Sequence, residues 1–385
     1  MNSYLFVFSS SCLLLYLAQK YDKKYPYFQI PLFILAAIIP AVLAAVRDDS
    51  IGTDTLVYAN PVFADALTAP NINGMEERWD GWIAKSYLWM NFIMSRITTH
   101  VEWVHFLIAF MECMVVILAL NNCKRYCSIW IGMLVYFCFF YVGSFNLIRQ
   151  YLACSMGLFA VTFLLKNKPL YFYLIIAISM LFHTSNALFV FIHLVYLYTN
   201  HFKTLFSKLI LIGVSISIVV SAQVFFDQYL ALMTIIGFDF FARYFLESND
   251  FDGGYKTVFL FAPLILFVIP FKKRIEKYTN HYDFFVCIIM IIIFGALLPL
   301  TNSIFLIRIV IPFNWMLCFI LPMIAKSTNK FLIAGQQLYI VRYVITLYSI
   351  AYFVVVYVIY KAGEAYPYTS KILDSTYSSF LKLGF

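Results

Sequence analysis

Residues 129–145 read IWIGMLVYFCFFYVGSF and contain no charged side chain. The basic pair Lys124-Arg125 precedes this run, and Arg149 follows it. A helix that crosses the hydrocarbon core of a bilayer needs about 17–25 predominantly apolar residues. The run therefore predicts a membrane-spanning helix whose ends are marked by basic residues.

Apolar runs of this kind recur along the chain. Of its 385 residues, 63% are hydrophobic and 12% are charged, whereas soluble domains have about 45–50% apolar and about 25% charged residues. This composition excludes a water-soluble enzyme, and the continuous runs exclude an alternating transmembrane β-barrel. We predict an all-α polytopic membrane protein, a single domain over residues 1–385 with about 12 spans. The expected spans are 3–18, 29–46, 101–120, 129–145, 149–165, 170–183, 185–199, 209–226, 257–270, 284–300, 307–325 and 338–360.

The charges divide the connecting loops into two sets. Most lysines fall in six alternate loops, at 19–28, 121–128, 166–169, 200–208, 271–283 and 326–337, and most acids fall in the others. The positive-inside rule places the lysine-rich loops in the cytoplasm and both termini outside. The net charge of +8 follows from this bias and does not indicate a nucleic-acid partner.

Two outward loops, 47–100 and 227–256, are long enough to carry function. The first ends in the amphipathic stretch Trp79–Ile97, which is expected to lie in the membrane interface. The outward side also holds most of the arginines: Arg47, Arg78, Arg96, Arg149, Arg243 and Arg308. A guanidinium group binds planar anions through two hydrogen bonds, so this bias indicates recognition of phosphate or carboxylate. The alternatives are snorkelling to lipid headgroups and, for Arg308, an ion pair with Asp54 or another outward acid.

Two polar clusters lie at predicted outer turns. Asn146, Arg149 and Gln150 fall at i, i+3 and i+4, so one helix face presents all three. The alternative is a polar helix cap. His183, in the sequence LFHTSN, is placed to act as a base, a donor or an anion ligand. The alternative is a turn histidine whose hydrogen bonds are satisfied.

Other titratable residues point less directly to chemistry. His105 is expected at the interface, and Glu112 is an acid near a span centre without an evident partner. The eight cysteines lie mostly in apolar runs and are expected to be buried. Cys123 and Cys127 lack two further ligands nearby, so we expect no zinc site.

The outward motifs form an ordered set along the chain. They are Arg47, Gly52-Thr53-Asp54-Thr55, Tyr58, Asn146-Leu147-Ile148-Arg149-Gln150, His183-Thr184-Ser185, Arg308-Ile309 and Pro312. In this order and spacing the set resembles the EpsG-type branch of Wzy-like polysaccharide polymerases. The resemblance covers roughly residues 40–325, and the residues beyond add little except Tyr366-Pro367-Tyr368. Outer loops vary freely in such families, so the resemblance does not identify the sugar.

The resemblance implies a bacterial inner-membrane polymerase of O-antigen, capsule or exopolysaccharide, with an architecture like the GT-C class. Such an enzyme moves a growing glycan from undecaprenyl pyrophosphate to the non-reducing end of a new lipid-linked repeat unit. Members commonly work with a chain-length regulator. An O-antigen ligase that moves a finished glycan would use similar residues. A flippase or secondary transporter is a further alternative, although transporters usually place charged residues near the midplane within repeats.

On this interpretation the predicted site residues fall into three groups. The predicted pyrophosphate ligands are Arg47, Arg149, Arg308 and Arg243. The predicted proton acceptor is Asp54 or His183. The predicted positioning residues are Asn146, Gln150, Tyr244 and Thr53. No cofactor or metal is expected, because the guanidinium groups can supply the charge that Mg²⁺ would.

Overall fold

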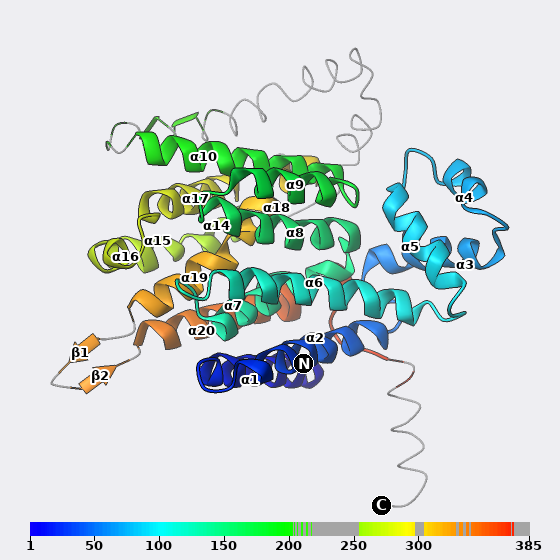
Figure 1. The fold of residues 1–385 in the computed structure, drawn as a ribbon, viewed down its shortest axis with the longest axis horizontal. Helices are drawn as coiled ribbons and strands as arrows, with labels where there is room; N and C mark the ends of the chain where they lie inside the picture. The colour runs from blue at the N-terminus through cyan, green and yellow to red at the C-terminus, as the bar shows by residue number, and fades with distance from the viewer. Residues whose placement is uncertain are drawn as a thin grey trace, which may run out of the picture.

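The computed structural model describes residues 1–202, 254–296, 304–328, 331–333, 336–338 and 340–370, with single positions between 204 and 217 and residue 372. Most of these residues are helical, and the longer helices lie alongside one another (Figure 1). The helices of the bundle include α1 (Asn2–Tyr21), α2 (Gln29–Ala45), α6 (Glu102–Asn122), α7 (Ile129–Tyr136), α8 (Ile148–Leu164), α9 (Pro169–Met180), α10 (Phe189–His201), α17 (Tyr282–Gly295), α18 (Ile304–Trp315), α19 (Leu317–Ser327) and α20 (Ile340–Phe353).

Further elements connect them. These include the α-helices α3 (Asn60–Thr68), α4 (Ile72–Arg78), α5 (Lys85–Ser95), α14 (Gly254–Phe261), α15 (Leu264–Val268) and α16 (Lys272–Tyr278). The 3₁₀ and π turns are η1 (Pro26–Phe28), η2 (Thr55–Ala59), η3 (Phe137–Tyr141), η4 (Gly143–Phe145), η5 (Thr184–Leu188), η7 (Val354–Ile359) and η8 (Ala362–Glu364). An antiparallel hairpin pairs β1 (Phe331–Ile333) with β2 (Gln336–Leu338).

The prediction of a helical membrane protein is confirmed by the length and composition of the helices. Among the residues that the structure describes, four stretches are long and apolar enough to cross a membrane: Pro26–Ala45, Glu102–Asn122, Val310–Ser327 and Ile340–Ile359. Many large apolar side chains on the outside of the bundle are exposed, including Phe6, Ile30 and Leu174. Exposed apolar surface of this extent is costly in water but is what a lipid-facing surface requires.

Several predicted boundaries differ from the structure. The expected span 307–325 is two helices, α18 and α19, and the expected span 257–270 is divided between α14 and α15. The loop 326–337 contains the β1–β2 hairpin, which the all-α prediction did not include. Most of the expected span 209–226 and most of the loop 227–256 lie outside the described residues.

The lysine-rich loops meet at one end of the bundle. The Tyr278 hydroxyl donates to the carbonyl oxygen of Arg125 at 2.8 Å, and the Lys326 ammonium donates to the same oxygen at 3.0 Å. Lys124 forms an ion pair with Asp22 at 2.8 Å. Four loops that the charge pattern assigns to one side of the membrane are therefore joined by direct contacts.

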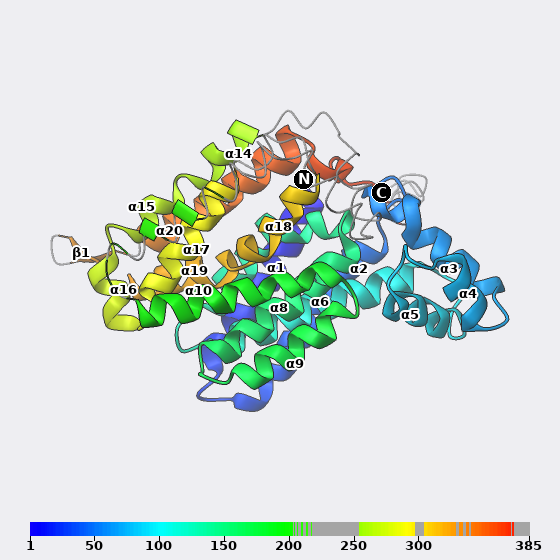
Figure 2. The ribbon, with the colours of Figure 1, turned by 90° about the horizontal axis from the view of Figure 1, so that it is seen from above.

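The outward loop 47–100 lies at the opposite end. In both views, α3, α4 and α5 project beyond one end of the bundle, while α16 and the hairpin lie at the other (Figures 1 and 2). The Tyr4 hydroxyl donates to the carbonyl oxygen of Ala365 at 2.8 Å, which joins α1 to the segment after α20. The arrangement agrees with the two-sided division of loops that the charges predict.

A serine compensates for the proline inside α2. Pro40 has no N–H, so the carbonyl oxygen of Ala36, four residues earlier, lacks its helical donor. The Ser11 hydroxyl on α1 donates to this oxygen at 2.7 Å. Both Ser11 and Ala36 are fully buried. An unpaired carbonyl at this depth would be costly, so the bond fixes α1 against α2.

This pairing predicts a non-additive double-mutant cycle. Ser11→Ala should lower the free energy of unfolding by about 1 kcal/mol, the upper range for such bonds between membrane helices. In a Pro40→Ala background, residue 40 regains its N–H and bonds Ala36, so Ser11→Ala should then have little effect. Denaturant unfolding in detergent measures the coupling; equal costs of Ser11→Ala in both backgrounds would contradict the compensation.

Candidate functional site

The loop that begins at Arg47 packs directly on the segment before α8. Gly52 has a φ of +84°, and a Cβ added there would lie 2.4 Å from the carbonyl oxygen of Phe145. Only glycine combines the left-handed backbone with this close approach. The glycine of the Gly-Thr-Asp-Thr motif therefore allows the loop to pack against the Phe145 backbone.

Asn146 joins three segments of the chain. Its Oδ1 accepts hydrogen bonds from the backbone N–H of Thr53 at 2.7 Å and from the Thr53 hydroxyl at 3.3 Å. A Cβ added at Gly363, in η8, would overlap the Asn146 amide nitrogen at 1.6 Å. Asn146 thus links the outward loop, the α8 entry and the segment after the last helix.

The segment after α20 was not expected to contribute. The backbone N–H of Asp48 donates to the carbonyl oxygen of Thr369 at 3.0 Å, and the Tyr368 hydroxyl donates to that of Leu43 at 2.8 Å. The sequence carried two signals for this segment: the Tyr366-Pro367-Tyr368 stretch, and the glycine at 363, whose φ is +72°.

Asp54 lies at the N-terminus of α8. Its Oδ2 accepts from the Tyr58 hydroxyl at 2.7 Å and from the backbone N–H of Ile148, the first residue of α8, at 3.3 Å. The N-terminus of a helix carries partial positive charge and favours anions. The carboxylate therefore anchors the loop on the helix while holding the Tyr58 hydroxyl.

Arg149 leaves the same helix end. Its guanidinium lies over the Tyr58 ring, 4.6 Å from the ring centre, and Nη1 donates to the carbonyl oxygen of Trp82 at 3.4 Å. Its Nε is buried and has no hydrogen-bond partner within the described residues. Arg149 is thus oriented by a ring against its face and a carbonyl oxygen at its edge, and one of its donors is unpaired within the described residues.

Gln150 and His183 meet through Ser185. Gln150 Nε2 donates to the Ser185 hydroxyl oxygen at 3.4 Å, and His183 Nδ1 lies 2.6 Å from the same oxygen. Gln150 is 2% exposed, and its Oε1 is buried without a partner in the described part of the chain. The Asn-x-x-Arg-Gln and His-x-Ser motifs, distant in sequence, are in direct contact.

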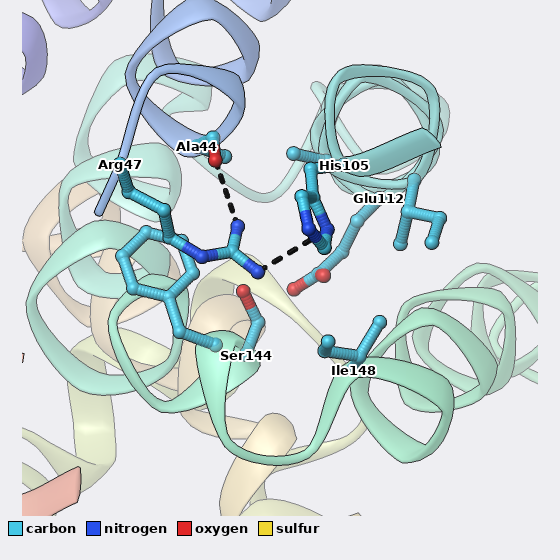
Figure 3. A pocket seen from close by; sticks show the side chains of 9 residues that line it. Ala44, Arg47, His105, Glu112, Ser144 and Ile148 are labelled. Carbon is cyan, nitrogen blue, oxygen red and sulfur yellow. Dashed lines mark hydrogen bonds between the residues drawn. The ribbon is translucent and has the colours of Figure 1, made fainter. Parts of the chain in front are cut away.

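Arg47 is held from several sides (Figure 3). Nη1 donates to the carbonyl oxygen of Ala44 at 2.8 Å, and Nη2 donates to the Thr55 hydroxyl at 3.2 Å. The guanidinium lies 4.7 Å from the centre of the Phe145 ring. Burial lowers the pKa of Arg47, which nearby tyrosines partly offset. The side chain is 9% exposed, so it contacts the protein interior far more than solvent.

His105 is buried rather than interfacial, at 5% exposure. Its Nδ1 lies 3.3 Å from Arg47 Nη2, and its Nε2 lies 3.1 Å from Asn60 Oδ1. Since a guanidinium only donates, Nδ1 accepts and Nε2 carries the proton that it donates to Asn60. Asn60 Nδ2 in turn donates to Asp49 at 2.9 Å. The interfacial prediction failed because the periodicity of α6 cannot show that Arg47 faces it.

Glu112 finds a partner that the sequence did not reveal. The Tyr136 hydroxyl donates to Glu112 Oε1 at 2.9 Å. Glu112 also lines a small cavity together with Arg47, His105 and Ser144, and the four polar side chains point toward one another (Figure 3). An acid in a membrane-spanning helix requires such polar surroundings.

Of the remaining outward arginines, two are paired within the outer helices and two have side chains outside the described residues. Arg78 forms an ion pair with Asp65, and Arg96 donates to the carbonyl oxygen of Ala69; both contacts lie within the outer helices. Arg243 and Tyr244 lie outside the described residues, as does the Arg308 side chain. The Arg308 backbone is in α18, four residues before Pro312.

The described site combines a helix N-terminus, an oriented guanidinium, an amide and an imidazole around the Asp54 loop. Such a set can bind an anion and accept a proton beside it. Among the described residues, no group of three or more His, Cys, Asp or Glu side chains is placed to hold a metal ion.

The arrangement can be compared with known proteins. A family model described as the EpsG family matches residues 30–370. No curated protein and no solved structure matches the chain. The matched range includes every outward motif and the segment after α20 that contacts Asn146, and it confirms the resemblance that the ordered motifs indicated.

The two glycines with positive φ in the outward loop provide a matched test. Gly52→Ala should lower the free energy of unfolding by about 1–3 kcal/mol more than Gly81→Ala, because its Cβ overlaps the Phe145 backbone. Gly81 has a φ of +69°, and a Cβ added there would have no atom within 4 Å among the described residues. Gly81→Ala therefore measures only the cost of placing an alanine at a positive φ. Thermal unfolding in detergent compares them. Equal decreases in the unfolding temperature of the two variants would show that the contact between Gly52 and the Phe145 backbone does not affect stability.

Proposed function

Because the chain belongs to the EpsG family, we propose that it is a polysaccharide polymerase, a membrane glycosyltransferase that extends a bacterial surface glycan. In this proposal the donor is a growing glycan on undecaprenyl pyrophosphate and the acceptor is a new lipid-linked repeat unit. A chain-length regulator is its proposed partner. The convergence of Asp54, Arg149, Gln150 and His183 around the N-terminus of α8 is the observation that carries the proposal.

The proposed setting is the bacterial inner membrane, with the site on the extracytoplasmic face. About twelve spans in a GT-C-like architecture would place both long loops on that face. The separation of the lysine-rich end from α3–α5 supports this orientation, because lysine-rich loops remain in the cytoplasm.

The pyrophosphate is proposed to bind at the α8 N-terminus. Arg149 would supply a planar pair of donors, and Arg308 would add a second guanidinium from α18. Fixed positive groups that face a leaving group stabilise the charge as it develops, and they are commonly the largest contribution to catalysis. The reaction is therefore proposed to need no metal or cofactor.

Arg47 is proposed to have a different role from the one predicted from sequence. Its hydrogen bonds go to Ala44, Thr55 and His105, and its face lies on Phe145. These contacts would hold the loop that carries Thr53 and Asp54 rather than a phosphate.

The group transfer is proposed to proceed by attack of an acceptor hydroxyl on the anomeric carbon of the donor. A new C–O bond forms, the bond to pyrophosphate breaks, and the hydroxyl proton passes to a base. Asp54 Oδ2 already accepts two hydrogen bonds, whereas His183 is oriented at Nδ1 by Ser185. We therefore assign His183 as the base, and Asp54 as the anchor of the loop.

Arg149→Lys tests the anion site. The substitution keeps the charge but removes the paired donors, so kcat/KM for lipid-linked repeat units should fall about 10- to 100-fold, equivalent to about 1.5–3 kcal/mol. Polymer length and yield are measured with the purified protein and lipid-linked repeat units. Arg96→Lys, an outward arginine that donates to the carbonyl oxygen of Ala69, is the control and should stay within about twofold. Unchanged length and yield in Arg149→Lys would refute the bidentate assignment.

A pair of variants separates the two candidate bases. His183→Gln should lower kcat at least about 100-fold and remove the loss of rate at low pH, where the imidazole is protonated. Asp54→Asn keeps an oxygen that accepts from Tyr58 and Ile148, so its kcat should fall less than about tenfold. Rates across pH are measured with the same assay. The reverse pattern would identify Asp54 as the base.

A further inference from the structure

Two tryptophans of the outward loop form a rigid stack. The rings of Trp79 and Trp82 are parallel within 7°, with centroids 5.7 Å apart. Trp79 Nε1 donates to Asp65 Oδ2 at 3.1 Å, and Asp65 also pairs with Arg78. The inner ring is therefore fixed by hydrogen bonding, and it backs the outer ring.

The outer ring is presented openly. Trp82 is 51% exposed, whereas the next residue, Ile83, is 6% exposed and anchors the turn. The backbone N–H groups of both residues donate to the carbonyl oxygen of Trp79, each at 3.1 Å. At the preceding residue, Gly81, an added Cβ would meet no atom within 4 Å among the described residues. A large aromatic face is thus held in place while one side stays accessible.

This face adjoins the candidate site. The carbonyl oxygen of Trp82 accepts from Arg149 Nη1 at 3.4 Å, and Arg149 in turn stacks on Tyr58. The residue that carries the outer ring is therefore in direct backbone contact with the proposed pyrophosphate site. A ligand that filled both positions would carry an anion at one end and a flat apolar face at the other.

We propose that Trp82, backed by Trp79, is a sugar-binding platform for the glycan part of the lipid-linked substrate. The inference rests on the proposed polymerase function. The C–H face of a pyranose ring carries partial positive charge and stacks on the electron-rich face of an indole. Glu77 and Asp80, close to the two tryptophans in the sequence, are exposed, and their carboxylates can accept hydrogen bonds from sugar hydroxyls.

The surroundings favour a sugar over a lipid chain. Glu77, Arg78 and Asp80 are all exposed and directly neighbour the stacked pair in sequence. A ring buried among lipid tails would bring these charged groups with it, at considerable cost. The alternative is that Trp82 lies in the membrane interface and binds no ligand. The experiment must distinguish this alternative from sugar binding.

Binding of a lipid-free probe tests the platform without requiring catalysis. The probe is the repeat-unit oligosaccharide released by mild acid from the lipid carrier of cells lacking this polymerase. It is titrated into the full-length protein in detergent and followed by calorimetry. Trp82→Ala should weaken binding about fivefold to tenfold, because aromatic stacking contributes about 1 kcal/mol. Trp82→Phe, which keeps a ring, should recover part of the affinity. Trp103→Ala removes another exposed tryptophan, at the start of α6, and should bind like the wild type.

Two results would overturn the platform. One is unchanged oligosaccharide binding in Trp82→Ala while the protein still polymerises lipid-linked units, which would leave the proposed function intact. The other is strong quenching of Trp82 by brominated phospholipid in vesicles, measured as the difference between wild type and Trp82→Phe, which would make it a membrane anchor. Failure of polymerisation with a Trp82-dependent loss of binding would instead reject the polymerase and keep the sugar site.

Discussion

The described site depends on the docking of the Gly52–Asp54 loop onto the entry to α8. Three contacts make this junction: Gly52 against the Phe145 backbone, Thr53 on Asn146, and Asp54 on the first N–H of the helix. The last two satisfy the backbone N–H groups of Thr53 and Ile148, which would be costly to leave unpaired in the interior. Because the same junction orients Tyr58 and Arg149, the geometry of the candidate site follows from it.

Charge in this protein is placed where the fold can compensate for it. Arg47 enters the interior with acceptors from the backbone, a hydroxyl and an imidazole, and Glu112 faces the same cavity with a donor from Tyr136. Isolated charges at these positions would be strongly destabilising. Arg47, His105, Glu112 and Ser144 line one cavity between α2, α6 and η4. We expect a substitution at one of them to change the stability contributed by the others.

Much of this organisation could be predicted from the sequence. Apolar runs predicted the helical membrane class, and lysine bias predicted which loops meet, because both are properties of the whole chain that neighbours in space do not alter. The motif residues Asn146 and Gln150 were identified by their spacing. Sequence could not show that His105 faces Arg47, nor that Tyr136 satisfies Glu112, since both contacts join separate helices. The hairpin after α19 was missed because short strands leave little periodic signal.

Residues 354–370, which follow α20, contain few of the residues from which function is usually inferred. Yet Gly363 packs against the Asn146 amide, and the carbonyl oxygen of Thr369 accepts the N–H of Asp48. This segment therefore covers the junction between the Gly52–Asp54 loop and the entry to α8, although it lies about 300 residues further along the chain than that loop. A protein truncated after η7 would keep the outward motifs from Arg47 to Pro312 but would lose the contacts of Gly363 and Thr369 with this junction.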